Sequence, residues 1–242
     1  MNRFFLKEQA DAINKIIDKT DISHLKNVLR IRAGELVEVV DLLGEEYIMK
    51  IKTVNSDCVE LTIEEKLDIK RETSIDITVY QGIPKGTRME YVIQKLTEIG
   101  VKKIVPVKMT RCVKDEINPS KMQRYAAIIK EAAMQSKRLI IPELEYPMNF
   151  DEMLETMKSN QQNVVFYENE QNKGIKDYVK QFPSVKSLGI VIGPEGGIDD
   201  SEIEKLKQEN LEILSLGNRI LRTETAGLIA SAIFIHEYDE NF

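Results

Sequence analysis

The sequence predicts an α/β protein in which a small β-rich domain precedes a larger domain built on a parallel sheet. Short extended segments separated by turn residues fill positions 36–64. Strand and helix patterns alternate after position 74, which is typical of a parallel sheet covered on both faces. A charged segment poor in apolar residues, 64–73, lies between the two patterns. We therefore expect one domain over residues 1–70 and a second over residues 74–242.

The composition is that of a soluble globular protein, with 42% hydrophobic and 31% charged residues among 242. No apolar run approaches the roughly 20 residues that span a bilayer, and the first residues lack the apolar core of a signal peptide. The two cysteines lie far apart without a CxxC motif, which favours a reducing compartment. With only two histidines, a metal site is not expected. These features predict a cytoplasmic protein without a metal.

The first domain reads as a small antiparallel sheet or barrel preceded by a helix. A helix is expected over residues 23–30, with Leu25, Val28 and Leu29 on one face. The β-branched and apolar residues that follow alternate in part, as they do in half-buried strands. The expected strands are 36–40, 46–53 and 58–64.

In the second domain, the helix predicted over residues 85–99 carries apolar residues at helical spacing and is ended by Gly100. The helix over 120–135 shows the same spacing, with Met122, Tyr125, Ala126, Ile129, Ala132 and Ala133 on one face. Further helices are expected from Asp200 and over residues 223–237. The expected strands are 75–80, 103–107, 163–167, 188–192 and 212–215.

The charge is unevenly distributed along the chain. The formal net charge is −6, yet residues 102–138 hold ten Lys and Arg against three Asp and Glu, a net charge of +7. A local basic stretch can bind a polyanion even when the whole molecule is acidic. The alternative, which charge alone favours, is a solvated helix face.

Two glycine-containing turns carry the most information. Residues 193–197, GPEGG, follow a buried-type strand and precede a helix start at which Asp199 and Glu202 predict a capping box. Residues 215–226, SLGNRILRTETA, join the next strand to the last helix. The first turn has neither the GxGxxG nor the Walker pattern, and its acidic Glu195 disfavours a phosphate ligand. If the two turns lie side by side at one edge of the sheet, they would form a pocket. If they lie apart, each is an ordinary turn between a strand and a helix.

These two motifs resemble the signature of the RsmE family, the ribosomal RNA uridine-N3 methyltransferases of the SPOUT class. The resemblance covers almost the whole chain and includes Arg3-Phe4-Phe5, His24-Leu25, residues 83–86, residues 95–101 and Glu131-Ala132-Ala133. Departures are mild, at Cys112 and Ile99. The resemblance implies a SPOUT-type parallel sheet with a deep trefoil knot, which general topology rules disfavour, after a PUA-like, RNA-binding β-barrel domain. It also implies a homodimer that methylates one uridine of 16S ribosomal RNA, on the assembled small subunit.

The resemblance further implies that S-adenosyl-L-methionine (SAM) binds in the knot and leaves as S-adenosyl-L-homocysteine. Carried over to this sequence, the cofactor-binding residues are Tyr167, Glu168, Gly193, Pro194, Glu195, Gly196, Gly197, Leu216, Gly217, Asn218, Ile220 and Leu221.

Methylation at uridine N3 requires loss of the N3 proton and stabilisation of the negative charge on the flanking carbonyl oxygens. Our hypothesis is that Arg222 or Arg138 stabilises that charge, and that Glu224 or Glu195 accepts the proton or orients an arginine. The basic stretch is expected to contact RNA phosphates. The expected RNA-binding residues are Arg3, Arg30, Lys85, Arg88, Lys121, Arg124, Gln135 and Arg219.

Two other functions are compatible with an α/β fold. A non-catalytic RNA-binding protein would have lost the cofactor site, and the intact GPEGG and LGNRILRTETA motifs argue against this. A dinucleotide-dependent enzyme needs a glycine-rich loop after the first parallel strand, and residues 82–86, GIPKG, lack that pattern.

Overall fold

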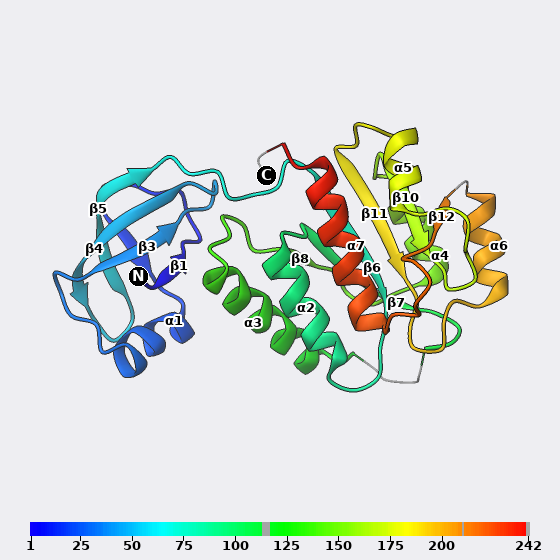
Figure 1. The fold of residues 1–242 in the computed structure, drawn as a ribbon. Helices are drawn as coiled ribbons and strands as arrows, with labels where there is room; N and C mark the ends of the chain where they lie inside the picture. The colour runs from blue at the N-terminus through cyan, green and yellow to red at the C-terminus, as the bar shows by residue number, and fades with distance from the viewer. Residues whose placement is uncertain (113–116, 210, 241–242) are drawn as a thin grey trace. The chain divides into compact units, whose positions relative to one another are not determined.

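The computed structural model describes residues 1–112, 117–209 and 211–240 (Figure 1). The chain divides into two compact units. The first contains Met1–Arg71 together with Lys137–Ile140, and the second contains Glu72–Ser136 and Ile141–Phe242. The segment 137–140 is thus part of the first unit, although it falls inside the second domain in the division proposed from sequence.

The first unit is a mixed five-stranded sheet. Its strand order is β1-β3-β4-β5-β2, and every pair is antiparallel except β1 with β3. The three expected strands are present, whereas β1 and β2 were not predicted because three residues are too few to show an alternating pattern. The strands are β1 (Arg3–Phe5), β2 (Asn14–Ile16), β3 (Leu36–Val40), β4 (Glu46–Val54) and β5 (Val59–Leu67).

The helix of the first unit begins earlier than expected and changes type. It consists of α1 (Lys19–Ser23), capped by Asp18, and a π-helical turn over His24–Val28. Leu25 in this turn is buried, but Val28 is 67% exposed. The prediction that Leu25 and Val28 share one face was therefore wrong.

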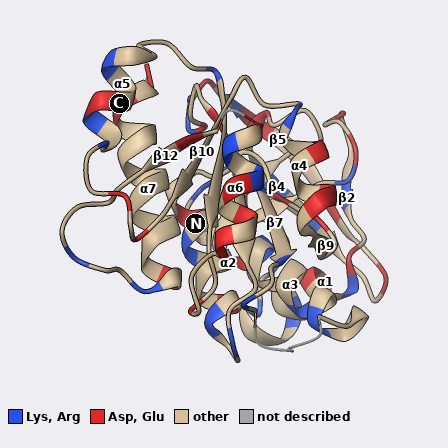
Figure 2. Cartoon of the chain, turned by 90° about the vertical axis from the view of Figure 1, so that its right-hand side faces the viewer, with Lys and Arg blue, Asp and Glu red and all other residues tan. Residues whose placement is uncertain are grey.

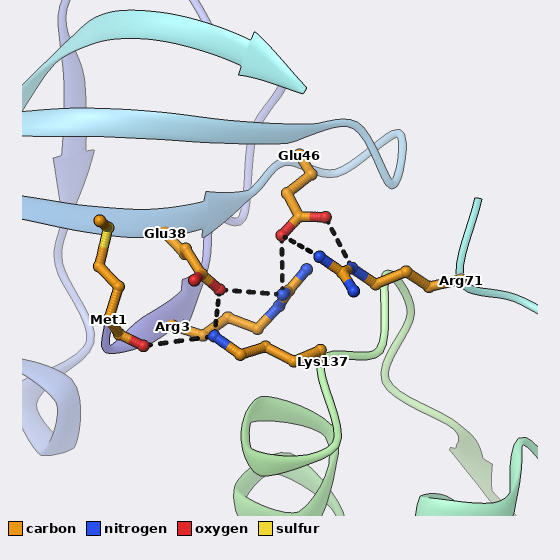
Figure 3. A network of polar contacts seen from close by, with 6 residues as sticks. All are labelled: Met1, Arg3, Glu38, Glu46, Arg71 and Lys137. Carbon is orange, nitrogen blue, oxygen red and sulfur yellow. Dashed lines mark hydrogen bonds and ion pairs between the residues drawn. The ribbon is translucent and has the colours of Figure 1, made fainter. Parts of the chain in front are cut away.

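A buried ion network joins the sheet of the first unit to two segments of the same unit that lie outside the sheet (Figure 3). Arg3 is 2% exposed, and its Nη1 donates to Glu38 Oε2 at 3.2 Å and to Glu46 Oε1 at 2.9 Å. Glu46 also accepts a hydrogen bond from Arg71 Nε at 2.9 Å, and Glu38 accepts one from Lys137. Arg71 and Lys137 thereby attach the chain ends of this unit to its sheet.

The second unit is built on the parallel sheet that the sequence predicts. Its strand order is β12-β10-β11-β6-β7-β8, with β9 also on β7, and every pair is parallel. The trefoil knot stays a prediction of the family resemblance. The strands are β6 (Asp76–Gly82), β7 (Lys103–Lys108), β8 (Glu143–Leu144), β9 (Met148–Asn149), β10 (Gln162–Phe166), β11 (Ser187–Ile192) and β12 (Glu212–Leu214).

Helices cover both faces of this sheet because successive strand residues point to opposite sides. Val164 and Phe166 pack in the core under α2, α5 and α7, whereas Val165 packs in the core under α4 and α6 (Figure 1). None of the helices in the described ranges is long and apolar enough to cross a membrane. The helices are α2 (Arg88–Ile99), α3 (Pro119–Gln135), α4 (Phe150–Met157), α5 (Ile175–Gln181), α6 (Asp200–Gln208) and α7 (Thr223–Tyr238).

Two details of the second unit differ from expectation, and part of the basic stretch is not described. Helix α2 begins at Arg88, three residues late, because Gly86 has a φ of +72° that no helix accommodates. Ala126 of α3 is exposed rather than on the buried face. Three residues counted in the basic stretch, Lys114, Asp115 and Glu116, lie outside the described residues.

Candidate functional site

A cavity of about 810 Å³ lies at the carboxyl ends of β10, β11 and β12. The loops after these three strands line it, so the two glycine-containing turns do lie side by side. Ligands of open parallel sheets bind at this edge. All the predicted cofactor-binding residues except Gly196 line the cavity: Tyr167, Glu168, Gly193, Pro194, Glu195, Gly197, Leu216, Gly217, Asn218, Ile220 and Leu221.

The GPEGG loop is compact in a way that only small residues permit. Gly197 has a φ of +75°, and a Cβ there would lie 2.4 Å from Glu168 Oε1. Gly196 lies on the other side of the loop, where a Cβ would come 3.0 Å from Arg111 Cβ. Gly196 is therefore a packing position beneath the site rather than a lining residue.

The start of α6 fixes the far end of this loop. Asp199 and Glu202 form the predicted capping box. Glu202 Oε1 also accepts a hydrogen bond from the backbone N–H of Thr110 at 2.8 Å, and Arg111 Nη2 lies 3.3 Å from Asp199 Oδ2. The connection after β7 thus holds the loop from one side.

A buried hydrogen-bond relay holds the same loop from the sheet side. The hydroxyl of Thr223 donates to the carbonyl oxygen of Gly193 at 2.6 Å. Its oxygen accepts a hydrogen bond from Gln81 Nε2 at 2.8 Å. Gln81 is fully buried at the end of β6, and Thr223 is the first residue of α7. These two side chains therefore join the strand, the GPEGG loop and the first turn of α7.

Glu195, in the middle of the loop, is bonded through one carboxylate oxygen to the connection between β6 and α2. Its Oε1 accepts a hydrogen bond from the backbone N–H of Lys85 at 2.9 Å and another from Arg88 Nη1. Partial burial raises the pKa of Glu195, but hydrogen bonds from its own backbone, Lys85 and Arg88 outweigh this and hold the pKa below its usual value. A carboxylate held in this way is a poor proton acceptor.

Glu224, in the first turn of α7, lies in a different environment. Its side chain is 14% exposed, with Oε1 3.7 Å from Arg88 Nε and 3.9 Å from Arg222 Nη1. Its Oε2 is buried without a hydrogen-bond partner among the residues that the structure describes. A buried, unpaired carboxylate oxygen is costly, and a ligand that donates a proton or a hydrogen bond would relieve that cost.

Of the three predicted catalytic residues, the structure brings two together at the cavity. Arg222 and Glu224 both line it, and the side chain of Arg222 is 80% exposed. Arg138 is buried, belongs to the first unit and does not line the cavity. It is therefore not used in the mechanism proposed below.

The backbone of the loop after β12 makes few bonds within the chain, among them one from the N–H of Gly217 to Ser215 Oγ at 3.2 Å. Residues 216–221 make no backbone–backbone hydrogen bond to any residue of the described ranges. Gly217 has a φ of +101° and open space where a Cβ would stand, and the side chain of Ile220 is exposed. Because backbone N–H and C=O groups need partners, this loop offers donors, acceptors and apolar surface to a ligand.

The predicted RNA-binding residues occupy varied environments. Arg30, Lys85, Arg124, Gln135 and Arg219 are exposed, and Lys121 and Arg88 are half-buried. Arg124 forms an ion pair with Glu90 at 2.7 Å. Arg3 is enclosed in the ion network of the first unit, so it has no route to RNA and is not proposed as a contact.

Several lining residues escaped the sequence prediction. In the loop after β10, Glu170, Gln171 and Asn172 line the cavity, as does Thr223. Hydrogen bonds from the backbone of Asn172 and Lys173 lower the pKa of Glu170. The polar run directly after a buried strand was a usable signal for this loop. Among the described residues, no group of three or more His, Cys, Asp or Glu is placed to hold a metal ion.

Comparison with known proteins identifies both units. The RNA methyltransferase domain model matches residues 71–235, and the RNA methyltransferase PUA domain model matches residues 17–64. The ribosomal RNA small subunit methyltransferase E of Bacillus subtilis is 33% identical over 95% of this chain and 94% of its own length. That of Mesomycoplasma hyopneumoniae is 31% identical over 94% of this chain and 96% of its own length.

Solved structures agree with the sequence relatives. The Neisseria gonorrhoeae ribosomal RNA small subunit methyltransferase E, bound to S-adenosyl methionine, superposes with a TM-score of 0.87 at 28% identity and covers 100% of both chains. A putative Legionella pneumophila methyltransferase in complex with SAM has a TM-score of 0.83 at 29% identity, over 96% of this chain and 95% of its own. The family-domain match over most of the chain and the 33% identity along nearly its whole length lead to one conclusion: the chain belongs to the ribosomal RNA small subunit methyltransferase E family.

Proposed function

We propose that this protein is a SAM-dependent methyltransferase that modifies N3 of one uridine in 16S ribosomal RNA. Membership of the family supports the reaction class, and SAM-bound family structures support the cofactor. The observation that carries the proposal furthest is the cavity at the ends of β10, β11 and β12, with the unpaired Glu224 Oε2 beside it.

The cavity fits the chemistry of SAM. The cofactor carries a sulfonium and an ammonium cation, a carboxylate and a flat adenine, and when bound it supplies an electrophilic methyl carbon. The loops offer carboxylates from Glu168 and Glu170 and, over residues 216–221, a backbone that makes no backbone–backbone hydrogen bond in the described ranges. The ends of β10 and β11 add the apolar side chains of Phe166 and Ile192. We assign the predicted cofactor-binding residues to this role, with Gly196 as a packing residue.

In this mechanism Glu224 accepts the N3 proton and Arg222 faces a flanking carbonyl oxygen of the uracil. Glu224 has the free acceptor atom, whereas both backbone and guanidinium donors already occupy Glu195. A positioned base contributes about 10²–10⁴-fold to the rate. Arg222 is exposed at the end of the turn and so can approach a base presented from solvent.

RNA binding is proposed for the exposed Arg30 of the first unit, and for the exposed Lys85, Arg124 and Arg219 and the half-buried Lys121 of the second. The exposed Gln135 adds a hydrogen-bonding group. The target uridine must leave its stack to reach a pocket, at a cost of a few kcal/mol. Phosphate contacts make the affinity fall as salt rises.

A homodimer in the cytoplasm, acting on the assembled small subunit, completes the proposal. Helix α7 is nearly free of charged residues (Figure 2), and its Ile229 and Ile233 are exposed, as is Tyr91 of the adjacent α2. Exposed apolar faces of this kind mark protein contacts. Sedimentation equilibrium of the purified chain, with a dimer expected, tests this part, and a monomer at micromolar concentration would contradict it.

The reaction and substrate are tested together in cells that lack the gene. Mass mapping of nucleosides in their ribosomal RNA should show loss of one 3-methyluridine from 16S RNA, restored by the returned gene. Purified protein with SAM should then methylate small subunits from these cells, and the naked RNA less. An unchanged 3-methyluridine content would refute the proposed function.

A further inference from the structure

Arg88 is a cavity-lining residue with two carboxylate neighbours. It is the first residue of α2, and its Nη1 donates to Glu195 Oε1. Its Nε lies 3.7 Å from Glu224 Oε1. From sequence alone, Arg88 is one of several basic residues expected to contact RNA, but its guanidinium already faces two anions of its own chain.

The two carboxylates belong to two different walls of the cavity. Glu195 is part of the GPEGG loop after β11, whereas Glu224 lies in the first turn of α7. One planar guanidinium therefore connects the loop to the helix. An arginine can do this because its donors form a rigid fork, which a lysine ammonium lacks.

The connection before α2 adds a second hold on the same loop. The backbone N–H of Lys85 donates to Glu195 Oε1 at 2.9 Å, next to the bond from Arg88. On the other side of the loop, Arg111 lies against Gly196 and Asp199. The loop is thus held from both sides by the segments that follow β6 and β7.

The exposed arginines of the site show a different pattern. Arg222 is 80% exposed and lies 3.9 Å from one carboxylate oxygen, and Arg219 is exposed. A phosphate or a base can reach these two side chains directly. The side chain of Arg88 is 41% exposed, and a phosphate that approaches it would be repelled by the neighbouring carboxylates of Glu195 and Glu224.

We propose that Arg88 is a positioning residue for the cofactor site and not an RNA contact. It holds the GPEGG loop against the start of α7 in the arrangement that binds SAM. This inference rests on the proposed function, because it assigns a ligand to the cavity that Arg88 borders.

The test measures SAM binding by calorimetry in the full-length variants Arg88→Met, Glu195→Gln and their combination. Loss of a hydrogen bond to a charged group predicts that Kd rises about tenfold in each single variant. The double variant should bind SAM no more weakly than the singles, because both substitutions abolish the same ion pair. Lys95→Met is the matched control: it too removes a cation of α2 from its glutamate, here Glu98 at 2.8 Å, but Lys95 does not line the cavity, so the Kd should equal that of the wild type.

Arg88→Lys separates geometry from charge. A lysine keeps the positive charge but lacks the rigid planar fork of the guanidinium, so we expect it to recover only part of the lost affinity. Full recovery by lysine would show that charge alone matters and would overturn the positioning role. Melting curves of each variant test whether weaker binding is caused by unfolding. If Arg88→Met does not fold, the test is made with Glu195→Gln, which keeps an acceptor for the backbone N–H of Lys85.

Binding of transcribed 16S RNA over a salt series supplies the opposing readout. If Arg88 positions the loop, the slope of log affinity against log salt in Arg88→Met equals the wild-type slope. If Arg88 contacts a phosphate, the slope falls by about one and SAM affinity stays unchanged, and that pair of results overturns the inference. A wild-type protein that binds no SAM refutes the proposed function itself, which is a distinct outcome.

Discussion

The two units of this protein each contain an arginine–carboxylate network, and the networks differ in what they leave unpaired. In the first unit both oxygens of Glu46 are occupied, by Arg3 and Arg71, and the unpaired atoms are donor nitrogens of Arg3. At the cavity the unpaired atom is an acceptor, Glu224 Oε2. Glu224 lines the cavity at the ends of β10, β11 and β12, and Arg3 is not among the residues that line it.

The difference shows how similar side chains serve different ends. In the first network the carboxylates are paired with cations of the same folded unit, so this network is structural. The second holds one carboxylate, Glu195, and leaves the other, the cavity-lining Glu224, with one buried oxygen that has no partner among the described residues. A vacant acceptor in a cleft is a feature of a functional site. The two networks should therefore respond differently to the same kind of substitution.

The largest expected effect is on catalysis, in Glu224→Gln. The amide cannot accept the N3 proton, so the single-turnover methylation rate should fall about 10²–10⁴-fold. SAM affinity should change only a few-fold. Rapid quench with small subunits that lack the modification measures the rate. A rate within threefold of the wild type would remove Glu224 as the proton acceptor and weaken the contrast between the networks.

The second effect is on stability, in Glu46→Gln. This change leaves the buried Arg3 guanidinium short of a counter-charge, and breaking a buried pair is costly. We expect a loss of about 3 kcal/mol, the lower end of the usual range, because Arg71 is 31% exposed and Glu38 remains beside Arg3. Urea unfolding measures the free energy. The control is Lys66→Met, which breaks the exposed pair with Glu45 and should cost less than about 1 kcal/mol; equal losses in both variants would contradict a structural network.

A smaller effect is expected from Thr223→Val. Valine keeps the shape but leaves the Gly193 carbonyl and the Gln81 amide without their shared partner. Weakening of this relay should raise the Kd for SAM about tenfold. Thr223→Ser keeps the hydroxyl and should bind SAM within about twofold of the wild type. Calorimetry measures the Kd for SAM of both variants. Equal affinities in the valine and serine variants would show that the relay does not contribute to cofactor binding.

The smallest effect is a pH dependence that arises from Glu195. Its pKa in the folded protein is lowered, so its contribution to stability is fully present above the ordinary carboxyl pKa and is lost as pH falls through the lowered value. Arg88→Met removes one cause of that shift. Acid titration followed by circular dichroism should show the variant unfolding at slightly higher pH than the wild type. Coincident acid transitions would show that the Arg88–Glu195 pair adds no stability.

Much of the second unit could be predicted because its strands are apolar runs. The strands β10 and β11 were expected within one residue of their observed bounds, since buried parallel strands lack polar interruptions. The helix α4 was missed although Asn149 and Glu152 form a capping box that the sequence displays. Sequence patterns can therefore locate a helix or a strand when the residues that carry the pattern lie within a few positions of one another.

The contacts that build the site were harder to predict. The two glycine turns were identified from sequence and resemblance, but the relay joins Gln81 to a residue 142 positions away. The burial of Arg3 depends on Glu46, 43 positions away. Nothing in the local sequence distinguishes a buried arginine from an RNA-binding one, because its partners are set by tertiary pairing.

The assignment of Lys137–Ile140 to the first unit bears on how the protein is made. Residues 1–71 leave the ribosome well before Lys137, so Glu38 lacks its lysine partner during that interval. Domains of nascent chains commonly fold in order from the N-terminus. Here the first unit attains its full set of contacts only after more than half of the polypeptide has been translated.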